Sequence, residues 1–582
     1  MNYKLYKEPI DFLVARQQIL YNRGIPVDQQ ETWLNAGWES ISNWRAFGEK
    51  QMIEAARELD IAIEDEQTMC VIVDCDCDGS TSAAVFINYM YHYYPNVKID
   101  YILHTGKQHG LADLDLDYLS TYDVVICPDS ASNDYKQHKY LQDRHTWILI
   151  LDHHICDEYS PYATTINNQM CEYPDKNLSG VGVTWQFLRA HEELYNKKND
   201  GYTNQLLDLV ALGNCGDMEP LTELEIRAVT NLGFSQIKNP FFYEMVKTND
   251  YSIQKMNGIN YLSIAFYVVP YINAIWRSGT QKEKDIVFRA MCTKYAFDEV
   301  DCSKRGHKGE KVKLYQEAVT IAQRVKRVQT KLQDDAMVAI EKHIKNENLL
   351  DNAVLAVVCE PGEVEKGIAG LVANKLQAKY QHPSMVLIKT KEKNDYGIVY
   401  RGSARNYSLC ENQDFKAECD KTGDMELAQG HSNAFGAAIK EEKFQDYINK
   451  TNEQYKDIDL TPTYWVDYIW NQNTIDSQKI LDIADLNIYG QEIPESLVVI
   501  ENIPLSENNV ILMSPDKNPT LKIQCGPVSI IKFKSSQEEW EKFIQPNTLV
   551  TIIGKCNKNE WMGKTSSQIL VEDFELQQKW VF

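Results

Sequence analysis

Residues 69–81 read MCVIVDCDCDGST, and this stretch decides the fold. A short apolar run, Met69–Val73, breaks into aspartates at positions 74, 76 and 78. Such a run followed by alternating acids is typical of a buried strand that ends in an acidic loop. Residues 83–91 then have helical composition. The sequence therefore predicts a strand, an acidic loop and a helix in succession.

Two later segments repeat this arrangement. The apolar run 124–127 leads into Pro128-Asp129-Ser130, and the run 147–151 leads into Asp152-His153-His154. The spacings leave room for crossover helices, which favours a parallel α/β sheet. Because the carboxyl ends of parallel strands meet at one edge, we expect these acids and imidazoles to lie together. A helix can bring Asp217, which follows an apolar segment and a turn, to the same edge.

The side chains expected at this edge form a mixed carboxylate and imidazole set: Asp76, Asp78, Asp129, His153 and Asp217. Oxygen ligands with one or two nitrogens suit Mn²⁺ or Mg²⁺ better than structural zinc, which favours thiolates. One cation would leave excess negative charge, so we expect a pair about 3.5 to 4 Å apart, the arrangement that hydrolyses phosphoesters. Cys75 and Cys77 offer an alternative soft-metal site, but strand-like alternation would point them away from the aspartates. We therefore interpret both cysteines as packing residues.

Composition bounds the class of protein. The chain has 582 residues, enough for several domains, and its 60 Lys and Arg against 83 Asp and Glu give a net charge of −23. This charge excludes a uniformly basic nucleic-acid coat, although not a local basic groove. The start, MNYKLYKEPIDFLV, lacks a basic segment followed by a long apolar core, and we find no apolar run of membrane length. We expect a cytoplasmic protein with reduced cysteines and no membrane partner.

Further elements follow along the chain. Residues 311–345 contain neither Pro nor Gly and carry one apolar seam, which predicts a long helix that connects domains, or else a helix packed inside one domain. Two strands, 353–358 and 385–388, are expected to flank a helix at 367–380. After a polar stretch from about 440 to 495, short alternating runs predict a small β-barrel: 498–501, 510–513, 521–524, 528–533, 549–554 and 569–571.

The barrel region is also locally basic. Between Lys517 and Lys564 there are eight Lys and no Arg against four Glu, with Trp540 and Trp561 among the interleaved aromatic residues. Lysines along a backbone and aromatic rings for stacking are the parts of a single-strand binding platform. The alternative is that about half of these aromatic residues form the barrel core.

Taken in order, the motifs resemble the DHH phosphoesterase superfamily and, within it, the RecJ-like single-strand-specific exonucleases. The matching segments are Asp74–Gly79, Pro128–Ser130, Asp152–His154, Ser179–Val183, Ala211–Leu221, Pro270–Ala274 with Arg277, Lys366–Gly370, Arg401–Arg405, Gly430-His431 and Asn559–Ile569. The resemblance covers the chain from about residue 50 onward.

The resemblance implies an α/β multidomain fold: a parallel-sheet DHH domain, a long connecting helix, a smaller α/β DHH-associated domain and a C-terminal OB-type β-barrel. We place the boundaries as follows: an N-terminal lead-in at 1–55, the DHH catalytic domain at 56–300, the connecting helix at 301–346, the DHH-associated substrate-binding domain at 347–455, a linker at 456–500 and the OB-fold nucleic-acid-binding domain at 501–582.

The resemblance also implies roles for individual residues. Two divalent ions, Mn²⁺ or Mg²⁺, would be held by the five residues named above, with Asp129 as the bridge and Asp74 supporting or ligating. His154 would contact the scissile phosphate, so that His154 and Asp129 are the catalytic candidates. Candidates for substrate binding are Arg277 at the terminal phosphate, Ser403, Arg405 and His431 along the nucleotide backbone, and Trp561 on the barrel. Arg277 and Arg405 have an alternative interpretation as surface ion-pair partners.

By this resemblance, the expected function is 5′ to 3′ hydrolysis of single-stranded DNA to 5′ mononucleotides in DNA repair, recombination or replication. Single-stranded DNA is then the substrate, and a single-strand-binding protein, a helicase or other repair proteins are the expected partners. An alternative is a DHH-family phosphodiesterase that acts on short oligonucleotides or cyclic dinucleotides, which does not need the barrel. A non-enzymatic replication scaffold is a third alternative, but eroded metal ligands would mark it, and here the ligands are intact.

Overall fold

The structure is a computed structural model that describes residues 1–106, 108–195, 198, 200–307, 309–391, 397–409 and 414–578. The chain divides into two compact units. The first unit comprises residues 28–328 and 487–494, and the second comprises 1–27, 329–486 and 495–582. Residues 579–582, with which the expected C-terminal domain ends, lie outside the described residues.

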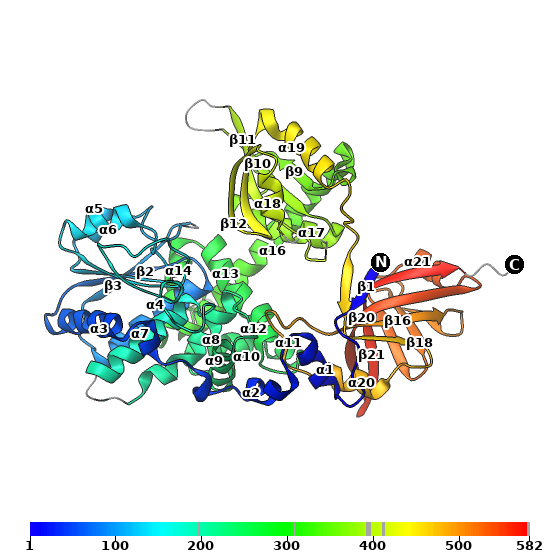
Figure 1. Ribbon diagram of the computed structural model, residues 1–582, viewed down its shortest axis with the longest axis horizontal. Helices are drawn as coiled ribbons and strands as arrows, with labels where there is room; N and C mark the ends of the chain where they lie inside the picture. The colour runs from blue at the N-terminus through cyan, green and yellow to red at the C-terminus, as the bar shows by residue number, and fades with distance from the viewer. Residues whose placement is uncertain are drawn as a thin grey trace. The chain divides into compact units, whose positions relative to one another are not determined.

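The first unit is built on a five-stranded, all-parallel sheet in the order β3-β2-β4-β5-β6 (Figure 1). Its strands are β2 (Met69–Val73), β3 (Ile99–Leu103), β4 (Val124–Pro128), β5 (Trp147–Asp152) and β6 (Thr164–Asn167). Strands β2 and β4 are fully buried, as apolar runs covered on both faces of a parallel sheet should be. The three predicted strands are confirmed, and β2 has the predicted bounds.

Helices surround this sheet. Helix α4 packs against α7 and α8, and α3 packs against α7. The helices of this unit are α2 (Gln30–Leu34), α3 (Glu49–Glu64), α4 (Cys77–Tyr93), α5 (Leu116–Leu119), α6 (Tyr135–Gln142), α7 (Gly180–Tyr195), α8 (Leu207–Gly216), α9 (Leu224–Ser235), α10 (Pro240–Thr248), α11 (Asp250–Gln254), α12 (Tyr261–Tyr267), α13 (Val269–Ser278), α14 (Gln281–Met291) and α15 (Thr293–Ala296).

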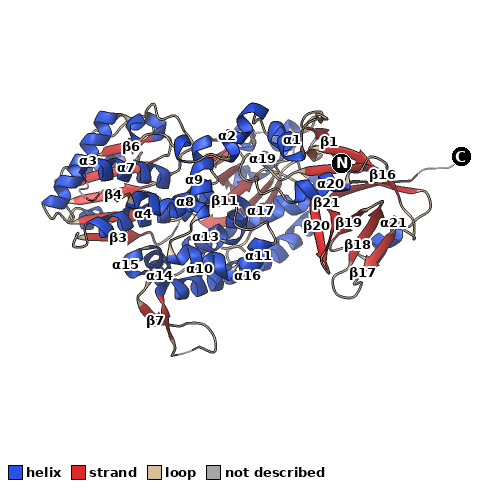
Figure 2. Ribbon diagram, turned by 90° about the horizontal axis from the view of Figure 1, so that it is seen from below, coloured by secondary structure: helices blue, strands red, loops and turns tan. Residues whose placement is uncertain are grey.

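A long helix links the two units along the chain. Helix α16 (Leu314–Glu347) has 34 residues, about 50 Å at 1.5 Å per residue, and crosses the boundary between the units at residues 328 and 329. The predicted helix began at 311, but residues 311–313 instead form β8 (Lys311–Lys313), which pairs with β7 (Glu299–Asp301). Figure 2 shows this hairpin extending away from the helices beside it.

The second unit contains a five-stranded sheet in the order β12-β13-β11-β10-β9. Its strands are β9 (Leu355–Cys359), β10 (Ser384–Lys391), β11 (Ile398–Arg405), β12 (Met425–His431) and β13 (Ala434–Lys440), and its helices are α17 (Ala369–Tyr380), α18 (Phe415–Asp420) and α19 (Glu441–Gln454). Two apolar cores form against it. One joins α17 to the end of α16 through Ala336, Ile340 and Ile344, and the other includes Phe415 and Tyr447. The predicted strand, helix and strand are found here.

A second sheet of this unit has seven strands in the order β15-β16-β20-β21-β19-β18-β17. The strands are β15 (Tyr468–Asn471), β16 (Leu497–Pro504), β17 (Val510–Met513), β18 (Thr520–Cys525), β19 (Val528–Lys532), β20 (Thr548–Trp561) and β21 (Lys564–Gln578), with helices α20 (Ser477–Ala484) and α21 (Gln537–Phe543). All six predicted runs are strands. The last two are much longer than predicted: residues 555–558 of β20 are half-buried, and residues 559–561 and 564–566 at the hairpin tip are exposed, so these segments show no apolar alternation.

The range 456–500, interpreted from sequence as a linker, is structured: residues 487–494 belong to the first unit and the rest to the second, partly to this sheet. Strand β15 pairs in parallel with β16, and β14 (Thr463–Val466) pairs in parallel with the N-terminal strand β1 (Asn2–Leu5). The sequence prediction missed β14 and β15 because each is only four residues long and polar residues flank the pair, although both strands are rich in aromatic residues.

The N-terminal residues also belong to this unit rather than forming a separate lead-in. In helix α1 (Ala15–Asn22), Asn22 bonds to Asp467, and the next residue, Arg23, forms a buried ion pair with the same carboxylate at 2.8 Å. Among the described residues, no helix is both long and apolar enough to cross a membrane.

Candidate metal centre

The acidic segment after β2 lies at the carboxyl edge of the sheet. Asp76 is the N-cap of α4, and its carboxylate accepts a hydrogen bond from the Gly79 amide at 2.9 Å. The segment is therefore a strand end and the first turn of a helix, not the loop that the sequence suggested. Cys77 is the first residue of this helix, and its side chain packs against Gly216. The cysteines are thus packing residues, as predicted, but their direction is set by the start of a helix and not by strand-like alternation. Cys75 donates to the Gln108 carbonyl.

Asp78 is fixed by the beginning of α7. Its carboxylate accepts hydrogen bonds from the Gly180 amide at 2.7 Å, the Val181 amide at 3.1 Å and the Ser179 hydroxyl at 3.1 Å. The unpaired amides of a helix N-terminus favour an anion at this position. The Ser179–Val183 motif thus orients a carboxylate of the site.

Asp129 follows β4 in a strained conformation. Its φ is 61°, a value that non-glycine residues rarely adopt, and its amide donates to the Leu151 carbonyl at 2.8 Å. Strain of this kind persists where the surroundings enforce it, commonly at functional sites. Gly180 leaves the space for this side chain, since a Cβ there would lie 2.4 Å from the Asp129 Oδ1.

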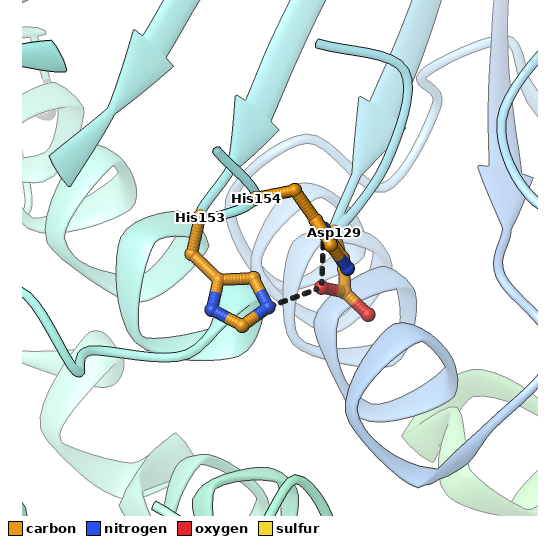
Figure 3. Close-up of side chains that lie close together, drawn as sticks. All are labelled: Asp129, His153 and His154. Atoms are coloured by element: carbon orange, nitrogen blue, oxygen red, sulfur yellow. Dashed lines mark ion pairs between the residues drawn. The ribbon is translucent and has the colours of Figure 1, made fainter. Parts of the chain in front are cut away.

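His153 lies at the middle of the cluster, and Figure 3 shows its ring and His154 directed at Asp129. Its Nε2 is 3.3 Å from the Asp129 Oδ1 and 3.5 Å from the Asp217 Oδ2. Asp217 directly follows α8, so a helix does bring it to this edge, and the turn expected just before it is instead the end of that helix. The His154 Nδ1 is 4.0 Å from the Asp129 Oδ1 and 2.8 Å from the Asp152 Oδ1. The predicted ligands therefore come together.

Three groups of side chains have ligand atoms that all lie within 4.8 Å of one another. They are Asp74, Asp76 and Asp129; Asp129, His153 and His154; and Asp78, His153 and Asp217. Asp129 and His153 each belong to two of the three groups, and the bridging position expected of Asp129 stays a prediction. The Oδ1 atoms of Asp74 and Asp129 are buried and have no hydrogen-bond donor among the described residues. Buried oxygens without donors and an oxygen-rich donor set fit hard divalent cations.

The pKa values of these carboxyl groups show that negative charge is crowded at the site. Burial and the nearby Asp217 raise the pKa of Asp78 to about 7. Burial and Asp76 raise the pKa of Asp217 to about 6. The pKa of Asp129 is raised well above its ordinary value by burial and by Asp78. A divalent cation relieves this repulsion, because it stabilises the ionised carboxylates.

His154 has the opposite character. Burial opposes its protonation, but the hydrogen bond and charge of Asp152 outweigh burial and raise the pKa of His154 to about 9. His154 therefore carries a positive charge at neutral pH. The pKa of His153 is lowered, chiefly by burial, which favours the neutral ring that ligates a metal.

Three residues of the site were not predicted from the sequence. Asp152 belongs to the Asp152-His153-His154 motif, but no role was expected for it. Its buried carboxylate orients His154 and accepts a hydrogen bond from the Ser132 amide. Glu219 lies 3.7 Å from the His153 Nδ1. The His109 Nδ1 lies 3.0 Å from the Asp74 Oδ2, and its ring is 4.7 Å from that of His154. Glu219 follows Asp217 within the quoted motif, whereas no sequence pattern marks His109.

Of the predicted substrate residues, Arg277 lies near this centre. It is on α13, where Asn273 accepts a hydrogen bond from the Cys77 amide at 3.1 Å. Burial lowers the pKa of Arg277, while the charge of Asp76 acts in the opposite direction. A guanidinium close to the carboxylate of a predicted metal ligand suits an anionic substrate group.

Ser403, Arg405 and His431 belong to the second unit. Arg405 on β11 and His431 on β12 both pair with Ala434 of the strand between them. A Cβ on Gly370 would lie 2.7 Å from an Arg405 guanidinium nitrogen and 3.4 Å from the Ser403 hydroxyl. Three predicted residues thus share one end of this sheet, next to the start of α17.

Trp561 lies at the tip of the β20–β21 hairpin. Its side chain is 69% exposed, and the two turn residues, Met562 and Gly563, have φ values of 49° and 75°. Positive φ at both turn positions is the geometry of a tight hairpin. The ring is therefore held at an accessible tip.

Comparisons with known proteins agree with this architecture. The DHH family N-terminal domain matches residues 68–214, and the RecJ OB domain matches residues 466–573, so the match begins before the predicted boundary at 501. A Bacillus subtilis (strain 168) protein, named as an SPbeta prophage-derived single-strand DNA-specific exonuclease, YorK, is 31% identical over 96% of this chain and 95% of that protein. The chain belongs to the RecJ-like branch of the DHH family.

More distant members of the family are also similar. The single-stranded-DNA-specific exonuclease RecJ of Escherichia coli (strain K12) is 23% identical over 76% of this chain and 77% of that protein. The crystal structure of RecJ from Thermus thermophilus in complex with Mn²⁺ has a TM-score of 0.72 at 16% identity, covering 97% of this chain and 76% of that one. The predicted family and fold class are confirmed.

Proposed function

We propose that this protein is a metal-dependent exonuclease that hydrolyses single-stranded DNA from the 5′ end to 5′ mononucleotides. The observation that carries the proposal is the complete ligand set at the sheet edge, with three overlapping groups of ligand atoms each within 4.8 Å. The family supports the substrate, since YorK and RecJ are named as exonucleases specific for single-stranded DNA. The 5′ polarity rests on the resemblance to RecJ.

The chain's own residues have distinct tasks in this reaction. Asp74, Asp76, Asp78, Asp129, His153 and Asp217 would hold two divalent cations, Mn²⁺ or Mg²⁺, because each has a ligand atom in one of the three groups. When bound, such cations activate water and neutralise charge on the phosphoryl oxygens. His154, protonated through Asp152, offers a charged donor to the scissile phosphate, and Asp152 keeps its ring in place.

Residues away from the cations bind the strand. We assign Arg277 to the terminal phosphate, and Ser403, Arg405 and His431 to the backbone of the nucleotides. Trp561, exposed at its hairpin tip, offers a ring for base stacking. Phosphate contacts and stacking do not read sequence, so the protein degrades strands of any sequence.

The second candidate is a phosphodiesterase of short oligonucleotides or cyclic dinucleotides, because the same metal centre serves either substrate. The OB domain matched at residues 466–573 favours the long strand, since a small substrate does not need it.

The resemblance to this family also suggests a cellular role. On that basis, we propose that the protein acts in the cytoplasm in DNA repair, recombination or replication, beside single-strand-binding protein or a helicase.

The test is Mn²⁺-dependent digestion of single-stranded DNA labelled at either end, beside a duplex, an RNA and a dinucleotide. Early release of the 5′ label as a mononucleotide, with the duplex spared, is the expected result. Cleavage of the dinucleotide alone would move the protein to the second candidate. Asp129→Ala and His153→Ala should abolish turnover in a folded protein, and near-normal hydrolysis by either variant would remove the metal-site assignment.

A further inference from the structure

Glu219 lies next to the proposed metal centre, and two hydrogen bonds hold its backbone in place. Met218, between Asp217 and Glu219, has a φ of 63°, so the chain turns sharply after the metal-ligand position. The Glu219 amide donates to the Asn214 carbonyl at 3.0 Å, and its carbonyl accepts from the Tyr261 hydroxyl at 3.4 Å. This turn returns the Glu219 side chain to the site.

The carboxyl group of Glu219 lies beside one of the proposed metal ligands. Its Oε1 is 3.7 Å from the His153 Nδ1. The side chain is 10% exposed, so water does not compete strongly for this contact. Glu219 is absent from all three groups of ligand atoms found among the described residues.

The two nitrogens of His153 therefore face different surroundings. Nε2 faces the Asp129 and Asp217 carboxylates, where the cations are expected, and Nδ1 faces Glu219. A neutral imidazole that ligates through one nitrogen carries its proton on the other, and an acceptor for that proton fixes both tautomer and ring orientation.

We propose that Glu219 is a positioning residue of the metal centre, whose carboxylate accepts a hydrogen bond from the Nδ1–H of His153 and so fixes the tautomer and orientation of that ring. This inference rests on the proposed function and names a residue outside its ligand set. Glu219 acts through His153 and does not itself bind a cation.

The test is Mn²⁺ titration of the full chain followed by electron paramagnetic resonance, which counts bound ions without any nuclease assay. Glu219→Ala removes the acceptor beside His153, and we expect two ions still to bind, with affinity lowered about 10- to 100-fold. Glu219→Gln keeps a carbonyl oxygen for His153, so it should stay within a few-fold of the wild type. Glu219→Met has similar volume but no acceptor, and repeats the test if the alanine variant does not fold.

Glu225→Gln is the matched control, because Glu225 is an equally buried carboxylate that binds Tyr173 and Gln186 instead of the metal ligands. It should bind Mn²⁺ as the wild type does. Wild-type affinity in Glu219→Ala or Glu219→Met would overturn the proposal. Loss of one bound ion in both Glu219→Gln and the apolar variants would also overturn it, since Glu219 would then be a ligand. If the protein binds two ions as expected but does not cut single-stranded DNA, the proposed function fails and the role of Glu219 stands.

Discussion

Replacing Gly180 with alanine tests whether Asp129 needs its observed position. An added Cβ would lie 2.4 Å from both the Cβ and the Oδ1 of Asp129, whereas ordinary contacts are 3.4–4 Å. Asp129 must therefore retreat by about 1 Å, and a misplacement of that size in a catalytic site costs about 100-fold in rate. This factor corresponds to about 2.7 kcal/mol of transition-state stabilisation.

The assay is single-turnover hydrolysis of an end-labelled single-stranded oligonucleotide at saturating Mn²⁺, with thermal unfolding measured in parallel. Gly182→Ala is the matched control in the same turn of α7, because its Cβ would meet only the flexible Leu178 side chain. We expect Gly182→Ala to lose some stability while it keeps its rate of hydrolysis. A Gly180→Ala variant that folds and cuts at the wild-type rate would refute the argument that packing between α7 and β4 sets the position of Asp129.

Three further predictions concern binding, stability and pH. Trp561→Ala should weaken binding of a long single strand by about 1–3 kcal/mol in a fluorescence titration, with less effect on hydrolysis of short oligomers, and equal effects would mean that the ring does not stack on bases. Arg23→Ala should lower the free energy of unfolding in urea by about 3–5 kcal/mol by leaving the buried Asp467 carboxylate unpaired, and the double variant Arg23→Met/Asp467→Leu should recover much of this loss. In EDTA, the pKa values of Asp78 and Asp217 in the folded protein, about 7 and 6, lie above the ordinary value for an aspartate. The folded protein therefore keeps these protons to a higher pH than the unfolded chain does, and its free energy of unfolding should fall as the pH rises from about 4 to about 7. The melting temperature of Asp78→Asn should therefore rise relative to the wild type across this range, and a constant difference would contradict the shift.

The sequence was sufficient for the sheet edge and its ligands because each strand there is a buried apolar run that ends in a polar motif. Asp76, Asp129 and His153 were expected together on topology alone, and Asp129 shares one group of neighbouring ligand atoms with Asp76 and another with His153. The sequence also predicted that Asp217 would arrive by a helix, and α8 ends at the preceding residue.

Other features of the site and the fold could not be predicted, because they depend on contacts between residues far apart in the sequence. His109 lies in the loop after β3, and its contact with Asp74 forms only when the chain folds. Strands β14 and β15 were missed because each is only four residues long and the pair lies between polar stretches. The tip of the β20–β21 hairpin, residues 559–561 and 564–566, is exposed, and it is held as strands by its pairing ladder and not by an apolar face.

The pairing of β1 with β14 constrains how this protein is made. Residues 2–5 leave the ribosome well before their partners, residues 463–466, which are synthesised some 460 residues later. At about 5–20 residues per second, the N-terminal strand waits between about 20 and 90 s before it can pair. During synthesis it is an unpaired strand edge, which other chains can capture. Production yield should therefore respond to chaperone supply and translation speed, and a fragment that starts at residue 28 would avoid this wait but lose the strand.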